Sequence, residues 1–149
     1  MKIYHETKSV SVPNPVVTIG IFDGVHKGHQ RIIGRIKEIS ENSGGETILV
    51  TFWPHPRTVL SKDIQVKLLS TYEEKINRIR LSGIDHLIIL PFTTEFANTP
   101  FDEFIARYLV NDIGSKHVVI GYNHHFGKDR KGGFEQLVQS SEKYNFSVE

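Results

Sequence analysis

The chain contains no cysteine in its 149 residues. Disulfide bonds, thiolate nucleophiles and cysteine-ligated zinc sites are therefore excluded. It also lacks any apolar run close to the roughly 20 residues that a membrane-spanning helix needs. Residues 1–6 have no apolar region typical of a signal peptide. We therefore expect a cytoplasmic protein without a membrane partner.

An excess of charge of either sign is also missing. The chain has 18 lysines and arginines and 17 aspartates and glutamates, which leaves a formal net charge of +1. This balance argues against a general nucleic-acid-binding surface but is compatible with a local phosphate pocket. The hydrophobic fraction of 38% and the charged fraction of 23% are ordinary for a globular domain. The length suffices for one domain with a core, and no internal repeat or second domain is visible.

Short apolar runs alternate with segments of helical periodicity. The pattern predicts strands over residues 16–22, 47–52, 86–92, 116–122 and 146–148. It predicts helices over residues 28–41, ended by Asn42-Ser43-Gly44-Gly45, and over residues 134–144, and a further helix that starts at Pro100 and is capped by Thr99. Another helix runs to about residue 82; Ser70 or Thr71 can cap it, and Glu73 or Glu74 can complete a capping box. Such alternation is typical of an α/β fold, a doubly wound parallel sheet with helices on both faces. In this fold, ligands bind beyond the carboxyl ends of the strands, which places the chemistry in loops 22–29, 53–57, 91–96 and 122–131.

Residues 20–29 read Gly-Ile-Phe-Asp-Gly-Val-His-Lys-Gly-His and lie at the first predicted strand-to-helix turn. A helix N-terminus presents free N–H groups and the positive end of the helix dipole, so it attracts anions. His26 and His29 are three residues apart and can face the same side. They would add donors to a phosphate site. Three glycines in this turn remove side chains where a phosphate would approach the backbone: Gly20, Gly24 and Gly28.

Other interpretations of these residues stay open. Two histidines at a turn can also be surface caps, and zinc would need three or four ligands where no matched set is visible, so we predict no metal site. Asp23 either hydrogen-bonds the turn or helps to hold a cation. Arg57 follows Pro-His-Pro, which is either a rigid strand-ending turn or the border of a phosphate site. Asn123 can pair with a ring edge and Phe126 can stack on an aromatic ring, or both shape a turn.

These residues also match a family. Gly20-x-Phe22-Asp23-Gly24-x-His26-x-Gly28-His29-Gln30 resembles the His-x-Gly-His signature of nucleotidylyltransferases, in the version of the adenylyltransferase domain of bacterial FAD synthetase, the bifunctional riboflavin kinase/FMN adenylyltransferase. Four further blocks resemble that family in the same order. They are Thr51-Phe52-x-Pro54-His55-Pro56, Leu68-Leu69-Ser70-Thr71-x-Glu73-Glu74-Lys75, Phe92-x-x-Glu95-Phe96-Ala97 with Phe104-Ile105, and Gly121-Tyr122-Asn123-x-x-Phe126-Gly127.

The resemblance implies a Rossmann-like nucleotidylyltransferase fold and an FMN adenylyltransferase, which transfers AMP from ATP to FMN and yields FAD and pyrophosphate. Mg²⁺ would accompany ATP. His26 and His29 would be the catalytic donors to the ATP phosphates, with Lys27 a weaker candidate. The implied substrate-binding residues are Gly20, Phe22, Asp23, Gly24, Gly28, Arg57, Asn123 and Phe126.

The chain departs from the family pattern at two places. His124 stands where the family usually carries phenylalanine, which changes the flavin stacking or adds a donor. The family's Ile-Ser-Ser-Thr-x-x-Arg motif and its riboflavin kinase domain are not found in residues 1–149, so we expect an adenylyltransferase domain that is incomplete at its C-terminal side. Two alternatives remain. One is a nucleotidylyltransferase with another acceptor, such as nicotinamide mononucleotide or phosphopantetheine, and the other is a non-catalytic flavin- or nucleotide-binding module.

Overall fold

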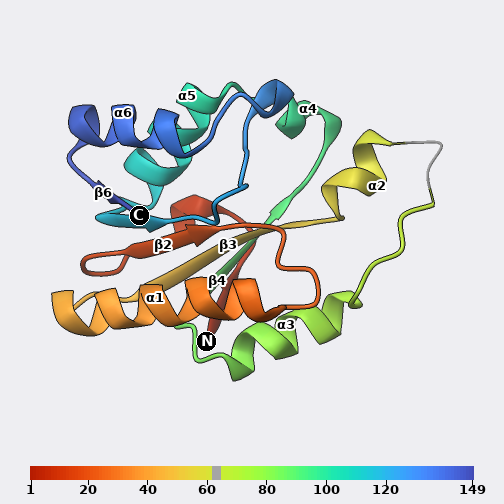
Figure 1. Cartoon of the computed structure of the whole chain (residues 1–149), viewed down its shortest axis with the longest axis horizontal. Coiled ribbons are helices and arrows are strands. Elements are labelled where there is room, and N and C mark those ends of the chain that lie inside the picture. Colours follow the sequence, from red (N-terminus) through yellow and green to blue (C-terminus); the bar gives the residue numbers. More distant parts are fainter. Residues whose placement is uncertain (62–64) are drawn as a thin grey trace.

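Within residues 1–61 and 65–149, which the computed structural model describes, six parallel strands form one sheet (Figure 1). The strands are β1 (Lys2–Tyr4), β2 (Val16–Ile19), β3 (Thr47–Trp53), β4 (His86–Pro91), β5 (His117–Val119) and β6 (Ser147–Val148). Their order across the sheet is β1-β4-β3-β2-β5-β6. Each neighbouring pair is parallel, so the predicted parallel α/β sheet is confirmed.

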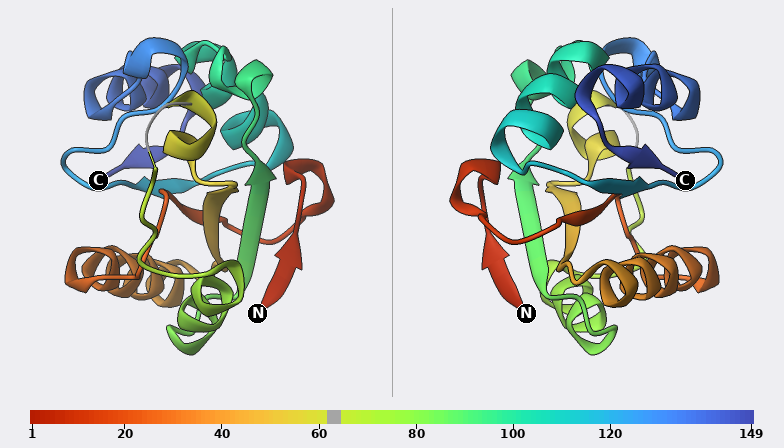
Figure 2. Two further views of the ribbon diagram at one scale, coloured as in Figure 1. Left: turned by 90° about the vertical axis from the view of Figure 1, so that its right-hand side faces the viewer. Right: turned by 90° about the vertical axis from the view of Figure 1, so that its left-hand side faces the viewer.

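Helices cover both faces of this sheet (Figure 2). One face carries α1 (Lys27–Ser43) and α3 (Tyr72–Leu81). The opposite face carries α4 (Thr94–Ala97), α5 (Phe101–Glu103), the π-helix η2 (Phe104–Asp112) and α6 (Phe134–Tyr144). The described residues also form the short helices η1 (Thr7–Ser9), α2 (Pro56–Leu60) and η3 (Lys128–Arg130). The doubly wound arrangement follows from this division of the helices.

The alternation of side chains along the strands builds a separate core on each face. Val17 and Ile48 point to the face of η2, where they join one apolar cluster with Leu109. Leu49, next to Ile48 in the chain, points to the other face and joins Ile36 of α1 in a second cluster. Both faces of β2 to β4 are thus apolar, which is why these strands read as nearly continuous hydrophobic runs in the sequence.

Local signals place most helix ends as the sequence predicts. Gly44 ends α1 with a left-handed φ of 63°, which glycine adopts without strain. Thr71 caps α3 in a capping box with Glu74. The prediction for Thr99 was wrong, because Pro100 is the residue before the first turn of α5 and no side chain caps that turn. The carbonyl of Thr99 instead accepts a hydrogen bond from the N–H of Lys128, at 2.8 Å.

Several other boundaries differ from the sequence prediction, and the strand predicted over residues 116–122 spans only His117–Val119 in β5. β2 ends at Ile19 instead of residue 22, because Phe22 has a φ of 52° and leaves the extended conformation. The Pro-His-Pro turn continues into α2. Pro56 is the first residue of this helix, a position that suits the fixed φ of proline and its missing N–H. β1 was not predicted, since a three-residue strand has too few positions to show an alternating pattern.

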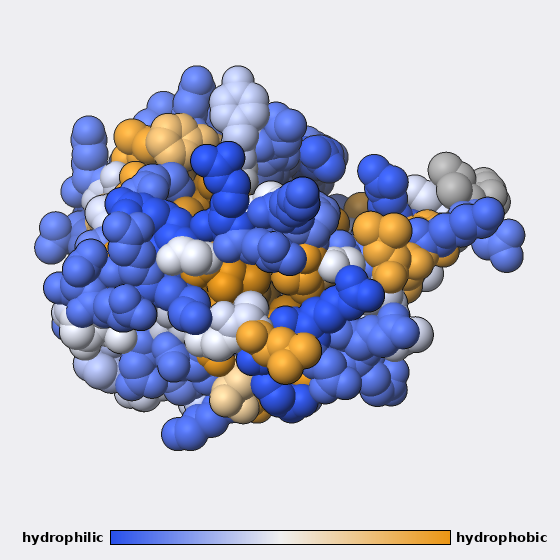
Figure 3. All heavy atoms as spheres, turned by 60° about the horizontal axis from the view of Figure 1, so that its bottom comes forward, coloured by the Kyte–Doolittle hydropathy of each residue, from blue (hydrophilic) through white to orange (hydrophobic). Residues whose placement is uncertain are grey.

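The surface over α1 and α3 is mostly hydrophilic, with hydrophobic residues exposed between the charged ones (Figure 3). An open groove of about 560 Å³ runs between these helices, and Leu81 at its rim is 87% exposed. Lys37 and Arg78, the two cations that line it, donate to the backbone carbonyls of Ser82 and Gly24. In the described part of the chain, no helix combines the length and apolar character needed to cross a membrane.

Candidate active site

The winding of the sheet reverses beside β2. The chain passes from β2 through β3 to β4 in one direction, and then returns to place β5 on the other side of β2. Two loops therefore diverge from neighbouring strand ends, residues 20–26 after β2 and residues 120–127 after β5. A parallel sheet opens a crevice at such a switch point, outside the carboxyl ends of its strands.

The two histidines of the first loop stand together at the start of α1. His26 is the N-cap residue, and its Nδ1 accepts the backbone N–H of His29 at 3.4 Å. The two rings are stacked, with centroids 3.7 Å apart and planes inclined by 18°. The structure thus places His26 and His29 side by side at the positive end of a 17-residue helix.

His29 is held as a neutral imidazole. Burial, followed by the nearby charges of His26 and Lys75, lowers its pKa from 6.5 to about 4. Its ring also packs on Phe22, with centroids 4.5 Å apart. The Nδ1 atom of His29 is buried and has no hydrogen-bond partner among residues 1–61 and 65–149. At neutral pH His29 can therefore offer one N–H donor to a ligand without itself carrying a charge.

The structure shows what fills the space beside each glycine of this turn. A Cβ added at Gly20 would lie 2.8 Å from the ring of Phe22, and one at Gly28 would lie 3.1 Å from the ring of His26. Gly24 has a φ of 74° and faces Leu69. Phe22 itself is only 1% exposed, so it supports the ring of His29 from the core. The approach of a phosphate to these glycines stays a prediction.

Asp23 fastens the turn to the segment that precedes α3. Its carboxylate accepts the N–H of Leu69 at 2.9 Å and both the N–H and the hydroxyl of Ser70 at 3.0 Å. Burial acts to raise the pKa of Asp23, but these hydrogen bonds outweigh it and the pKa is lowered. Of the two roles considered for Asp23, the structure shows the hydrogen-bonding one, although across to another segment instead of within its own turn.

A cavity of about 570 Å³ brings together residues from four strand ends and meets the histidine turn at Ile21, whereas neither His26 nor His29 is among its described lining residues. Ile21 reaches it from the loop after β2, Arg57 from α2, and Asn123 and Phe126 from the loop after β5. The volume is within the range of sites for cofactors and drug-sized ligands. The wall is aromatic, with Phe52, Phe92, Phe96 and Phe104. The rim carries the exposed cations Arg57, Lys128 and Arg130.

The loop after β5 is closely packed against α5 and η2. Phe126 is 7% exposed and its ring centroid lies 5.4 Å from that of Phe104. Gly127 has a φ of 76°, and a Cβ there would come within 2.8 Å of the backbone of Phe101. Phe126 is therefore part of the core as well as the cavity wall, whereas Asn123 is exposed at the mouth.

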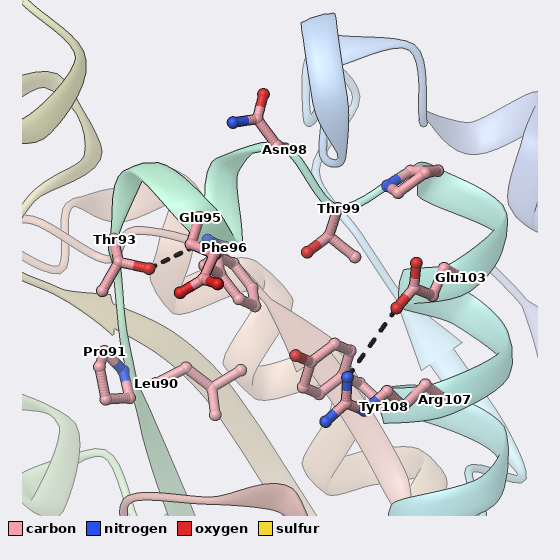
Figure 4. A pocket seen from close by; sticks show the side chains of 11 residues that line it. Leu90, Pro91, Thr93, Glu95, Phe96, Asn98, Thr99, Glu103, Arg107 and Tyr108 are labelled. Atoms are coloured by element: carbon pink, nitrogen blue, oxygen red, sulfur yellow. Dashed lines mark hydrogen bonds and ion pairs between the residues drawn. The ribbon is translucent and has the colours of Figure 1, made fainter.

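A second cavity, of about 520 Å³, lies between α4, α5 and η2 (Figure 4). Arg107, a cation in its lining, extends toward Glu103, with 3.8 Å between the charged atoms. Thr93 accepts the N–H of Phe96 and caps α4. None of the residues predicted to bind substrate is among the described residues that line this cavity, whereas Arg57, Asn123 and Phe126 line the cavity at the switch point.

Comparison with known proteins decides the family. A sequence model described as FAD synthetase matches residues 9–149, which is most of the chain. The chain belongs to the FAD synthetase family. The family predicted from the five sequence blocks is thereby confirmed.

Three curated relatives illustrate the extent of the match. A bifunctional riboflavin kinase/FMN adenylyltransferase of Listeria monocytogenes is 38% identical and covers 85% of this chain and 40% of its own length. One of Buchnera aphidicola from Acyrthosiphon pisum is 35% identical, with coverages of 97% and 46%. A second Listeria protein, named FAD synthetase, is 34% identical, with coverages of 89% and 54%. The chain spans about half the length of these relatives.

Two solved structures share the fold. A crystal structure named as a macrolide-efflux protein from Streptococcus pneumoniae superposes with a TM-score of 0.81 at 25% identity, over 99% of this chain and 49% of that one. A universal stress protein from Archaeoglobus fulgidus superposes with a TM-score of 0.50 at 19% identity, over 92% of each chain, and shows only a similar fold. The Rossmann-like class predicted for a member of the FAD synthetase family is confirmed.

Lys75 was not among the site residues predicted from the sequence, although its charge acts on His29. It lies on α3 with 5% exposure, and its Nζ donates to the carbonyl of Phe52 at 3.3 Å and lies 6.0 Å from the ring centre of Trp53. Burial lowers its pKa from 10.5 to about 8, and its charge acts on His29. A signal was present, because Lys75 lies four residues before the buried Ile79 on the inward stripe of α3.

Proposed function

We propose that this chain is an FMN adenylyltransferase domain that transfers AMP from ATP to FMN and releases FAD and pyrophosphate. The observation that carries the proposal is the stacked pair His26 and His29 at the start of α1, beside an aromatic cavity at the switch point of the sheet. The pair supplies donors for a triphosphate, and the cavity has the size and lining for a flavin.

The reaction needs charge stabilisation and positioning more than proton transfer. A phosphate oxygen of FMN attacks the α-phosphorus of ATP, and the bond from that phosphorus to the bridging oxygen of pyrophosphate breaks. The attacking phosphate is mostly dianionic at neutral pH, since its second pKa is about 6, so no general base is required. The protein then lowers the barrier by holding the reactants in line and by stabilising the leaving pyrophosphate.

The residues of the turn have distinct parts in this scheme. Nδ1 of His26 accepts a helix N–H, so its Nε2–H is the donor left for phosphate oxygens. His29 adds a neutral donor, and the first N–H groups of α1 add the field of the helix. The buried charge of Lys75 makes the region more positive. On the acceptor side, Arg57 would contact the FMN phosphate while Asn123 and Phe126 hold the ring.

Mg²⁺ would enter with ATP and neutralise charge on the triphosphate. The carboxylate of Asp23 already accepts hydrogen bonds from Leu69 and Ser70. In residues 1–61 and 65–149, no three histidine or carboxylate side chains gather as a metal-binding group. Such a set of side chains fits a Mg²⁺ ion that is held mainly by phosphate oxygens and water, which is how Mg²⁺ commonly binds with nucleotides.

The names of two curated relatives pair the adenylyltransferase with a riboflavin kinase. A riboflavin kinase domain makes the FMN that this reaction consumes. We therefore propose a riboflavin kinase domain as the partner of this domain, within the same longer chain. The small-molecule partners are ATP and FMN.

The test is to incubate the chain with FMN, ATP and Mg²⁺ and to measure FAD by chromatography. We expect FAD from the wild type and a loss of about 10²–10³ in turnover for His29→Ala, the usual effect of removing one donor to a developing negative charge. His5→Ala, which removes an exposed histidine outside the turn, is the matched control.

Other outcomes separate the alternatives. Saturable binding of ATP or FMN without FAD formation would support a non-catalytic binding module. Turnover only with nicotinamide mononucleotide or phosphopantetheine would indicate a different acceptor. If His29→Ala unfolds the protein but keeps full activity per folded molecule, the catalytic assignment is wrong.

A further inference from the structure

His124 forms part of the cavity wall in the loop after β5. Its ring lies nearly parallel to that of Phe126, with centroids 6.0 Å apart and planes inclined by 22°. The surrounding wall is aromatic, since Phe92, Phe96 and Phe104 line the same cavity. His124 therefore introduces ring nitrogens into a wall that otherwise offers stacking surface.

The hydrogen-bonding capacity of His124 is not used within the described protein. Its Nε2 atom is buried and has no hydrogen-bond partner among residues 1–61 and 65–149. Burial, followed by the charges of His125 and Arg130, lowers the pKa of His124 from 6.5 to about 4, so the ring is neutral at pH 7. A buried polar atom without a partner is destabilising, and proteins rarely keep one that has no further role.

The backbone is also strained directly after this loop, in η3. Asp129 and Arg130 both line the cavity, and both have left-handed φ values, 57° and 55°. Residues other than glycine reach this region only at an energetic cost, and such positions cluster at ligand clamps. The strain is consistent with a loop whose side chains complete their contacts when a ligand is present.

We propose that His124 is a specificity-determining residue that hydrogen-bonds the polar edge of the isoalloxazine ring of FMN. This inference rests on the proposed function. Nε2 of a neutral imidazole is either a donor or an acceptor, depending on the tautomer, so it can pair with either an N–H or a carbonyl group of the flavin edge. The phosphate of FMN is better served by the cations at the cavity rim, Arg57, Lys128 and Arg130. His124 would thus contact the ring of FMN, and the cations at the rim would contact its phosphate.

The test compares two flavins that share the ring and differ in the phosphate. Wild type and His124→Phe are titrated with FMN and with riboflavin, and binding is followed by flavin fluorescence. We expect His124→Phe to bind both flavins about tenfold more weakly, with the KM for ATP unchanged. The same variant removes an unpaired buried nitrogen, so its thermal stability should be equal to or above that of the wild type. A purely structural role would not combine weaker binding with undiminished stability.

Two further variants serve as controls. His5→Phe changes an exposed ring that does not line this cavity and should alter flavin affinity less than twofold. His124→Gln keeps a donor and an acceptor and should recover part of the lost affinity. Wild-type affinity in His124→Phe would overturn the inference, as would a loss for FMN but not for riboflavin, which indicates a phosphate contact. If the wild type binds neither flavin, the proposed function fails as well.

Discussion

Replacement of Lys75 by methionine provides a direct test of the electrostatics beneath the site. Lys75 is buried on α3, and its pKa falls from 10.5 to about 8 because burial disfavours the charged ammonium. At 1.36 kcal/mol per pKa unit, this difference corresponds to about 3 kcal/mol of destabilisation at pH 7. The variant also loses the hydrogen bond to the carbonyl of Phe52, about 1 kcal/mol. We therefore expect Lys75→Met to be more stable than the wild type by about 2 kcal/mol.

The stability gain of Lys75→Met should become smaller as the pH rises above about 8. Below pH 8 the lysine is protonated in both the folded and the unfolded chain, so the full penalty is present. Between about pH 8 and 10.5 the unfolded chain binds more protons than the folded one, so wild-type stability rises with pH relative to the variant. Above 10.5 this difference disappears.

Urea unfolding of both proteins at pH 7 and at pH 10.5 measures the effect, and thermal unfolding at pH 7 should show a rise in Tm of about 4–8 °C. Lys116→Met, at an exposed position, should change stability by less than about 0.5 kcal/mol. On the proposed function, the variant should also make FAD more slowly, because the positive charge that acts on His29 is lost. A Lys75→Met protein that is less stable at pH 7, or whose stability gain is the same at both pH values, would refute the reasoning.

Three further predictions concern the turn and the cavity. Gly20→Ala should cost about 1–3 kcal/mol in urea unfolding, because the new Cβ would lie 2.8 Å from the ring of Phe22; an unchanged midpoint would show that the ring moves freely. Asp23→Asn should lower the free energy of unfolding by about 1–3 kcal/mol, because an amide cannot accept every hydrogen bond that the carboxylate receives from Leu69 and Ser70. Equal stability of the variant and the wild type at pH 7 would contradict this. The pKa of His124 is about 4 when folded and 6.5 when unfolded, so the unfolded chain binds more protons between these values and wild-type stability falls as the pH is lowered from 6.5 to 4. His124→Phe should therefore show a shallower acid-induced loss in the same assay, and parallel curves would refute the assignment.

The sequence was sufficient for features that depend on neighbours within about one turn or one strand. The capping box at Thr71 and the left-handed end of α1 at Gly44 are short-range geometries and could be predicted. The parallel α/β class followed from continuous apolar strands between helices. Boundaries were predicted less well where one residue changes the backbone, as Phe22 does at the end of β2.

The site was predictable as a set of residues but not as an arrangement. The motif placed His26 and His29 at a helix start, and the structure shows them stacked there. That Arg57 and Asn123 line one cavity follows only from the strand order, since β3 and β5 both lie beside β2. No local pattern contains that order, because it results from packing both apolar faces of the sheet under helices.

The sequence by itself determined the kinds of element, their succession and the family signature. Only the tertiary structure decided which side chains lose their water, and with it the neutral state of His29, the lowered pKa of Lys75 and the unpaired nitrogen of His124. The physical reason is that periodicity and capping are set by residues a few positions apart. Desolvation and charge interactions instead depend on segments that are distant in the chain and meet only in the folded protein.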